Sequence, residues 1–310
     1  MLRLRAPLAA FAVGLALAGA PLAEPAPAES SGAPQPELLA LIREPSLREI
    51  SGLAVSRRHR GLLWVHNDSG YAAELHAVDR RGRRQATLRL EGIEAIDWED
   101  LAAFTLDGRH YLLVADTGDN GGRRSELVVH VVEEPAELVD AEVKPAWSQR
   151  LRWPDGPRDV EAVAVDSAAR EILFIAKKRV PPQLLSLPLG PQRGVAQARV
   201  RAGLAGIAPP SPTELAANTR FGKYRAQITA ADLSEDGLRL AVLNYRHAHV
   251  YTRSEGENWA SALARVPQEY SFGWVAQAEA IAFEPDGDAL LLSGERLPAP
   301  LIRLPLAPAD

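Results

Sequence analysis

Three glutamates begin the same short motif, and their carboxylates are the side chains in this sequence best suited to chemistry. Each glutamate is followed by small and apolar residues, in Glu99-Asp-Leu-Ala-Ala, Glu161-Ala-Val-Ala-Val and Glu279-Ala-Ile-Ala-Phe. Carboxylates that meet in a partly desolvated site repel one another unless a cation or a proton compensates their charge. If the fold places the three together, the sequence predicts either a divalent metal site or a set of ion pairs.

Polar loops supply partners for either arrangement. The loops are His66-Asn67-Asp68-Ser69-Gly70, Asp116-Thr117-Gly118-Asp119-Asn120, Lys177-Lys178-Arg179, Asn244-Tyr245-Arg246-His247 and Glu295-Arg296. Carboxylate and amide oxygens suit calcium, which takes six to eight oxygen ligands. The basic side chains of Lys177, Lys178, Arg246 and Arg296 would instead neutralise the glutamates as ion pairs. The loops that begin at His66 and at Asp116, each taken alone, are also typical of tight turns, because Asp, Asn and Gly hydrogen-bond locally.

Several other chemistries are excluded by composition and motif. The chain has 310 residues and no cysteine, which removes thiol nucleophiles and disulfides. It contains no Gly-x-Ser-x-Gly elbow and no phosphate-binding loop. The net charge of -5 argues against a nucleic-acid partner, and 46% hydrophobic residues indicate a globular protein with a sizeable core.

The glutamate motif belongs to a longer internal repeat. Ser51-Gly-Leu-Ala-Val and Thr229-Ala-Ala-Asp-Leu share the pattern, so the five motif starts lie 48, 62, 68 and 50 residues apart. Asp107-Gly108, Asp236-Gly237 and Asp286-Gly287 follow three of the motifs, and Asp-Gly between apolar runs predicts a hairpin. Each motif is thus the first strand of a hairpin, and further strands follow it.

The repeat predicts an all-β protein. Expected second strands are 62–65, 111–115, 172–176, 238–243 and 289–292; third strands 74–78, 127–132, 184–187, 249–252 and 301–304; fourth strands 85–90, 148–153, 198–202 and 262–266. Four-stranded units at this period predict a β-propeller with five four-stranded blades, and residues 38–43 would close the ring as the missing strand of the fifth. A sixth blade hidden in the longer intervals and a β-sandwich are the alternatives.

A propeller would gather the candidate residues at one end of its channel. Inner strands begin there, and the loops between second and third strands open on the same face. The predicted channel-face residues besides the glutamates are Ser51, His66, Asn67, Asp68, Asp116, Asp119, Asn120, Lys177, Lys178, Thr229, Asn244, Arg246, Glu295 and Arg296. The long connection 205–227 should lie there too, with Tyr224 and Arg225 as lid residues. Trp98 is expected to pack between blades.

Five segments carry a resemblance to known proteins. At WVHNDSG (64–70), DWEDLA (97–102), DTGDN (116–120), DVEAVAVD (159–166) and AEAIAFEPDG (278–287), the chain resembles a family of uncharacterised secreted bacterial β-propellers. More distantly it is similar to the esterase-like propellers, namely strictosidine synthase and the gluconolactonase and paraoxonase group. That group implies calcium at the channel mouth, with Glu99, Glu161 and Glu279 as acidic ligands and Asn67, Asp119, Asn120 and Asn244 as their partners. Those relatives mostly have six blades, whereas five are counted here.

The first residues are typical of an export signal. Arg3 and Arg5 precede a short apolar run, which predicts a signal peptide over 1–28; an uncleaved anchor is the alternative. A disordered Pro/Ala/Ser-rich leader over 29–36 and a single propeller domain over 37–310 would follow. The expected product is a periplasmic or secreted monomer that has no membrane contact after cleavage.

Two classes of function remain from the sequence. One is a calcium-dependent hydrolase of an ester, lactone or phosphoester, in which Glu161 or Glu279 acts as catalytic base for water. The other is a non-catalytic module that binds a small molecule or a protein at the channel face. A glycosidase with paired carboxylates is a third reading, but 6% aromatic residues is low for a sugar cleft.

Overall fold

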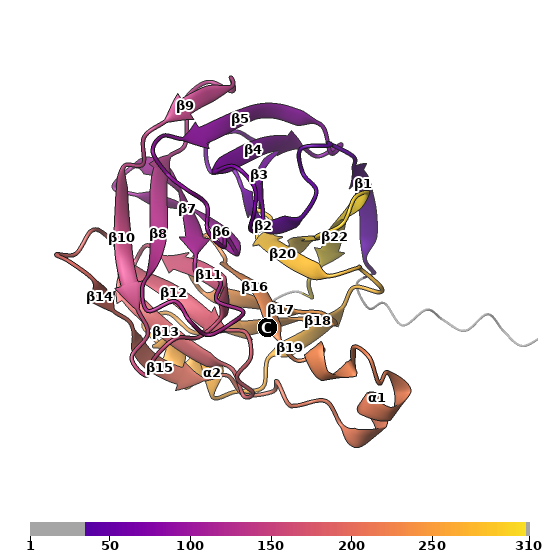
Figure 1. Cartoon of the computed structure of the whole chain (residues 1–310). Coiled ribbons are helices and arrows are strands. Elements are labelled where there is room, and N and C mark those ends of the chain that lie inside the picture. The colour runs from indigo at the N-terminus through magenta and orange to yellow at the C-terminus, as the bar shows by residue number, and fades with distance from the viewer. Residues whose placement is uncertain (1–34, 308–310) are drawn as a thin grey trace, which may run out of the picture. The chain divides into compact units, whose positions relative to one another are not determined.

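The structure is a computed structural model and describes residues 35–307. The predicted signal peptide and most of the predicted leader lie outside the described residues. Within residues 35–307, the strands form five sheets, and each sheet is one blade of a β-propeller (Figure 1). The predicted all-β propeller with five blades is therefore confirmed.

Each blade is an antiparallel meander that runs from an inner to an outer strand. Blade 1 contains β2 (Ile50–Val55), β3 (Leu62–Asn67), β4 (Glu74–Asp79) and β5 (Arg84–Leu90). Blade 2 contains β6 (Asp100–Leu106), β7 (Arg109–Asp116), β8 (Leu127–Glu133) and β10 (Trp147–Arg152). Blade 3 contains β11 (Val160–Asp166), β12 (Glu171–Ala176), β13 (Gln183–Pro188) and β15 (Arg199–Gly203). Blade 4 contains β16 (Ile228–Leu233), β17 (Arg239–Asn244), β18 (His247–Thr252) and β19 (Gln268–Ser271).

Blade 5 closes the ring as the repeat predicts. It contains β20 (Ala278–Phe283), β21 (Ala289–Gly294), β22 (Ala299–Pro305) and, as its outermost strand, β1 (Glu37–Ile42). β1 pairs antiparallel with β22, so the first described strand completes the last blade. The inner strands β2, β6, β11, β16 and β20 lie side by side around the ring, and β20 returns to β2.

The two long repeat intervals contain insertions and no sixth blade. In the first interval, β9 (Ala141–Val143) leaves blade 2 and pairs parallel with β5 of blade 1. In the second, β14 (Ala196–Gln197) pairs parallel with β10, and the helices α1 (Pro212–Ala217) and η1 (Gly222–Tyr224) precede β16. The capping box of α1 explains its position: the Ser211 side chain accepts from the Glu214 N–H, and the Glu214 carboxylate accepts from Ser211.

One predicted strand is wrong. Residues 262–266 do not form the fourth strand of blade 4. The helix α2 (Trp259–Leu263) includes the first two of them, and β19 supplies the fourth strand instead. Asn258 caps α2 with its side chain, and Trp259, Ala262 and Leu263 are its buried residues. This spacing of i, i+3 and i+4 is the helical period, which outweighs the apolar character of the segment.

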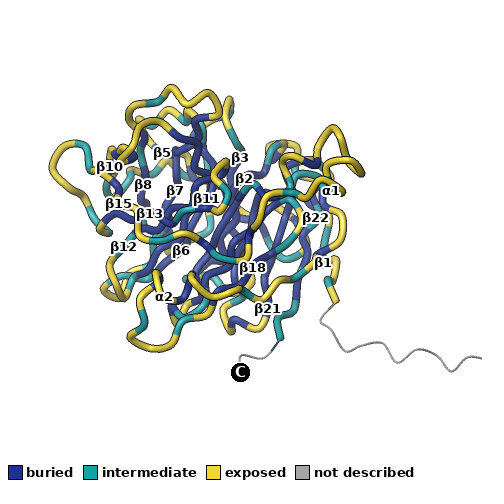
Figure 2. Tube along the Cα trace, turned by 90° about the horizontal axis from the view of Figure 1, so that it is seen from below, coloured by how far each residue is buried: buried dark blue, intermediate teal, exposed yellow. Residues whose placement is uncertain are grey.

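The hydrophobic core is divided among the interfaces between neighbouring blades. Five clusters of buried side chains fill the five interfaces, from blades 1 and 2 round to blades 5 and 1. Figure 2 shows the buried inner strands and the exposed loops at their ends. Strands buried on both faces need near-continuous apolar sequence, which explains the motifs' small and apolar residues. Trp98 is fully buried between blades 1 and 2, where it was expected.

Asp100 ties three blades together inside the ring. One carboxylate oxygen, Oδ2, accepts hydrogen bonds from Val163 N (2.8 Å) in blade 3 and Ala231 N (3.1 Å) in blade 4. The other oxygen accepts from Leu101 N at 2.8 Å, and the side chain is completely buried. Asp232 makes a similar link, since its Oδ2 accepts from Phe283 N (2.8 Å) in blade 5. These aspartates fix the inner strands whose ends hold the candidate site.

Candidate site at the channel mouth

The repeated motif corresponds to a repeated irregularity of the backbone. In blades 1, 3, 4 and 5 the register of the inner strand shifts at one residue, and those residues are Ser51, Glu161, Thr229 and Glu279. In blade 2 the pairing is regular, and Glu99 lies one residue before β6. A β-bulge turns the extra residue out of the normal alternation and re-aims its side chain. The bulges thus give the motif residues an orientation that a regular strand would not.

The hydroxyl residues of the motif have a structural role. Ser51 Oγ donates to Glu99 O at 2.6 Å, and Thr229 Oγ1 donates to Ala278 O at 2.7 Å. Thr117, in the loop after β7, makes the corresponding bond to Val160 O at 2.7 Å. Each bond joins neighbouring blades at the start of an inner strand, so these hydroxyls hold the acidic residues in place.

Five carboxylates gather at this end of the ring and form what we call the channel-mouth cluster: Asp68, Asp97, Glu99, Asp159 and Glu161. Oxygens of Asp68, Asp97 and Glu99 lie within 4.8 Å of one another, as do oxygens of Glu99, Asp159 and Glu161. Glu99 belongs to both groups and therefore joins them. The predicted meeting of Glu99, Glu161 and Asp68 is present in this arrangement.

Asp97 and Asp159 are not among the residues predicted from the sequence, although a repeated spacing in the sequence marks both. Each stands two residues before a motif glutamate, in Asp97-Trp-Glu99 and Asp159-Val-Glu161. The repeated Asp-x-Glu spacing marks blades 2 and 3, whose inner strands are neighbours in the ring. It places an additional carboxylate beside each of those two glutamates.

Glu99 is the least compensated member of the cluster. Its side chain is 4% exposed, and no hydrogen bond or ion pair reaches its carboxylate from the residues that the structure describes. Burial raises the pKa of Glu99 well above its usual range, and the neighbouring carboxylates of Glu161, Asp68 and Asp97 raise it further. Burial and the charges of Asp68 and Asp159 raise the pKa of Asp97 to about 6. The cluster therefore favours either bound protons or a bound cation.

Among the described residues, basic side chains form ion pairs with only one half of the cluster. Lys177 forms a buried ion pair with Glu161, and Lys178 Nζ lies 2.8 Å from Asp159 Oδ2. The other two predicted basic partners lie elsewhere. Arg246 pairs with Glu214 of α1 at 2.8 Å, and Arg296 Nε is 3.9 Å from Glu295 Oε2. The half made by Asp68, Asp97 and Glu99 has no ion pair among the described residues.

Gly118 makes room for the uncompensated half. A Cβ atom at this position would lie 2.1 Å from Glu99 Oε1 and 2.4 Å from Asp97 Oδ2. Asp116 holds the adjoining backbone, since its carboxylate accepts from Ile96 N at 2.9 Å and pairs with Arg124 at 2.7 Å. The glycine of the predicted DTGDN loop thus lets two carboxylates lie close to the loop backbone.

Glu279 lies close enough to the cluster to interact with the charges of Lys177 and Asp68, but it has a hydrogen-bond partner of its own. It is 7% exposed, and its Oε1 accepts a hydrogen bond from Tyr245 Oη at 2.7 Å. Burial and the charge of Glu295 raise the pKa of Glu279 to about 7, although the Tyr245 hydrogen bond opposes the shift. Among the described residues, Glu279 is in neither carboxylate group of the cluster.

The predicted amide ligands are engaged in local bonds. Asn67 accepts from Glu49 N at 3.1 Å and donates to Ser46 O at 2.7 Å. Asn244 Oδ1 accepts from the backbone N–H groups of Arg246 and His247. Exposed Asn120 accepts from Lys178 Nζ at 3.2 Å.

Two further predicted residues also serve the local structure. Both carboxylate oxygens of Asp119 accept backbone N–H groups, from Arg123 at 2.7 Å and from Arg124 at 3.0 Å. His66 is buried against Trp98, and burial lowers the pKa of this histidine to about 4. The amide, Asp119 and His66 side chains thus shape the loops around the cluster.

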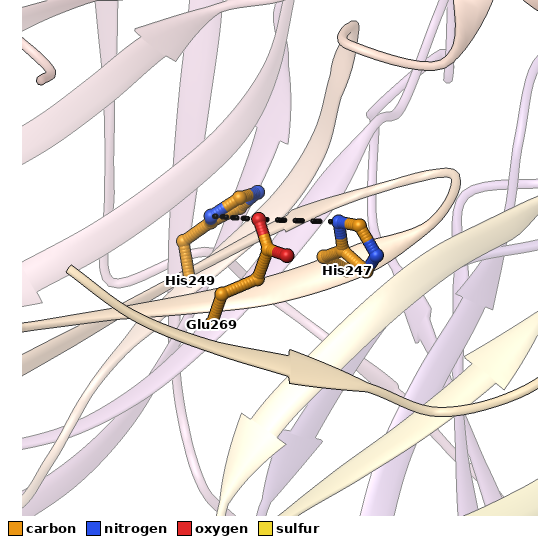
Figure 3. A group of neighbouring side chains, drawn as sticks. All are labelled: His247, His249 and Glu269. Carbon is orange, nitrogen blue, oxygen red and sulfur yellow. Dashed lines mark ion pairs between the residues drawn. The ribbon is translucent and has the colours of Figure 1, made fainter. Parts of the chain in front are cut away.

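His247, His249 and Glu269 form a second group of potential ligands on β18 and β19 (Figure 3). Glu269 Oε2 lies 3.3 Å from His247 Nδ1 and 3.7 Å from His249 Nδ1. Asn244 Nδ2 lies 3.0 Å from His249 Nε2, and its Oδ1 already accepts two backbone N–H groups. Nε2 must therefore accept, which leaves the hydrogen of neutral His249 on Nδ1. A nitrogen that carries hydrogen is no metal ligand, so this group does not suit a metal.

Comparisons with known proteins give a fold-level likeness. No family model and no curated protein matches the chain. The structure is similar to a chain of the solved structure "Crystal structure of Nidogen/Laminin Complex", with a TM-score of 0.45 and 10% sequence identity over 80% of this chain and 73% of that chain. Within residues 35–307, no helix has the length and apolar character needed to cross a bilayer.

Proposed function

We propose that this β-propeller is an exported protein whose channel-mouth cluster binds a calcium ion, and that the site hydrolyses an ester, lactone or phosphoester. The observation that carries the proposal is Glu99, a buried carboxylate without a partner among the described residues, beside Asp68 and Asp97. A buried charge that lacks a partner is costly, and a cation removes that cost. The all-oxygen donor set fits a hard cation such as calcium.

Asp68, Asp97 and Glu99 would hold the ion in this proposal. A bound divalent ion supplies a Lewis acid that polarises a carbonyl or phosphoryl oxygen. Glu279 is the better candidate for the base that activates water, since its pKa of about 7 suits proton transfer near neutral pH. Glu161, the other predicted base, is held by Lys177 in an ion pair. Tyr245 would orient the Glu279 carboxylate through its hydrogen bond.

A single methyl group at Gly118 is expected to weaken calcium binding at least tenfold. The backbone of Gly118 is not among those with positive φ, so alanine acts there through its volume alone. Its Cβ would push apart Glu99 and Asp97, which the ion must bring together. Isothermal titration calorimetry of Gly118→Ala measures the change. The matched control is Gly203→Ala, whose Cβ would meet nothing closer than 3.9 Å; equal affinity in both variants would contradict this ligand set.

Turnover on a panel of esters, lactones and phosphoesters tests the catalytic part of the proposal. Glu279→Gln is expected to lower kcat by about 10²- to 10⁴-fold, the usual contribution of a general base. Calcium binding should stay close to that of the wild type. Glu284→Gln removes a glutamate that pairs with Arg80 and serves as the control. A calcium-loaded protein that turns over none of the panel would contradict the hydrolase.

The second candidate is a non-catalytic module that binds a small molecule or a protein at the same face. It is favoured by Lys177 and Lys178, which pair with Glu161 and Asp159 and so give half of the cluster a structural charge balance. A propeller is compatible with either function, since this fold hosts many. Export, membership of the secreted bacterial family and a monomeric state stay predictions of the sequence.

A further inference from the structure

The cluster contains two adjoining groups of three carboxylates, and Glu99 is common to both. The first group, Asp68, Asp97 and Glu99, we call the open subsite; the second, Glu99, Asp159 and Glu161, we call the lysine subsite. Each group brings three oxygens within 4.8 Å of one another. Two cation subsites that share a bridging carboxylate are the arrangement found in two-metal centres.

Lys177 places an ammonium group at the lysine subsite. Its side chain is 10% exposed, and its Nζ atom forms an ion pair with Glu161. Its backbone N–H also donates to Asp159 O at 3.2 Å, which anchors the residue beside a second member of the group. Burial favours the neutral amine, but the carboxylates of Glu161, Glu99 and Glu279 outweigh it and raise the pKa of Lys177.

We propose that Lys177 is a tethered cation that fills the second of two cation subsites and so restricts the cluster to one divalent ion. The inference rests on the proposed calcium site and goes beyond it, because it concerns how many ions the cluster holds. The ammonium of Lys177 neutralises the Glu161 carboxylate and repels a divalent ion from its oxygens. Lys178, which pairs with Asp159 of the same subsite, is 42% exposed and free to turn into solvent, whereas Lys177 is held in place by burial. The open subsite, where Glu99 has no partner among the described residues, remains for the free ion.

Replacing Lys177 is therefore expected to add an ion. We would count calcium bound per chain by equilibrium dialysis and elemental analysis, in wild type and in Lys177→Met. Methionine keeps much of the side chain's length and apolar stem but carries no charge. The variant should bind one calcium ion more than the wild type. Lys177→Arg, which keeps a tethered cation, should bind the same number as the wild type.

Two controls separate this inference from simpler effects. Lys144→Met removes the same charge at an exposed position that pairs with Glu91, and should leave the count unchanged. If Lys177→Met needs calcium to fold, the double variant Lys177→Met with Glu161→Gln removes both partners, and its count should return to that of the wild type. A Lys177→Met count equal to the wild type, or a gain shared by Lys144→Met, overturns the inference. A wild type that binds no calcium would contradict the proposed function. The difference in count between Lys177→Met and the wild type would still test the inference.

Discussion

Asp100→Ala is expected to lower the free energy of unfolding by about 3 to 6 kcal/mol, among the largest effects of any single substitution in this chain. The Asp100 carboxylate accepts three backbone N–H groups from three blades and is completely buried. Alanine would leave these donors unpaired in the centre of the ring, and each buried unpaired group costs about 1 to 3 kcal/mol. Urea denaturation followed by circular dichroism measures the loss.

The role of Asp100 as a hydrogen-bond acceptor can be separated from its negative charge. Asp100→Asn retains one oxygen for the Val163 and Ala231 N–H groups, so it should cost clearly less than alanine. Glu126→Ala, at an exposed ion pair with Arg150, should change stability by about 1 kcal/mol or less. A loss for Asp100→Ala as small as that of Glu126→Ala would contradict the account of the inner ring.

Glu279 should make the calcium-free protein less stable as pH rises from about 4.5 to 7. Its pKa is raised to about 7 in the folded protein, chiefly by burial, from a usual value of 4.5. Between these values the folded state keeps the proton that the unfolded state releases, so the favourable contribution present at low pH is lost. A shift of this size corresponds to about 3 kcal/mol.

Glu279→Gln removes that titration and provides the measurement. Urea unfolding at pH 4.5, 6 and 8 in chelator should show the glutamine variant gaining about 3 kcal/mol relative to wild type across the range. Glu126→Gln deletes the same charge at an exposed position and controls for net charge. Wild-type and Glu279→Gln stabilities that stay parallel across this pH range would show that Glu279 titrates normally.

The fold was largely predictable because the propeller repeats itself. Five motifs and the Asp-Gly turns placed the inner hairpins, and Gly108, Gly237 and Gly287 indeed have positive φ. The bulges at Glu161 and Glu279 were not predictable, since a shift in register depends on the partner strand. The strand expected over 262–266 failed because the Asn258 cap and the spacing of the apolar residues favour α2.

The site was predictable in its location more than in its members. The motif placed Glu99 and Glu161 at one end of the ring, where the structure has them within one cluster. Asn67 and Asn244 suit a metal by residue type, but the loops use their amides for backbone N–H and C=O groups. Such competition depends on loop conformation, which residue type does not determine. The choice of Glu161 as the partner of Lys177 likewise depends on how the strands and loops lie relative to one another, which residue type does not determine.

The central claim is that the uncompensated carboxylates bind a cation, and the most direct test is the melting temperature of protein stripped with chelator and titrated with calcium. Calcium at about a hundredfold above its dissociation constant should stabilise the wild type by roughly 2.7 kcal/mol and raise the melting temperature by several degrees. In Glu99→Gln the rise should disappear, because the ligand shared by both halves of the cluster is lost. A wild-type melting temperature that does not change at millimolar calcium would contradict the claim.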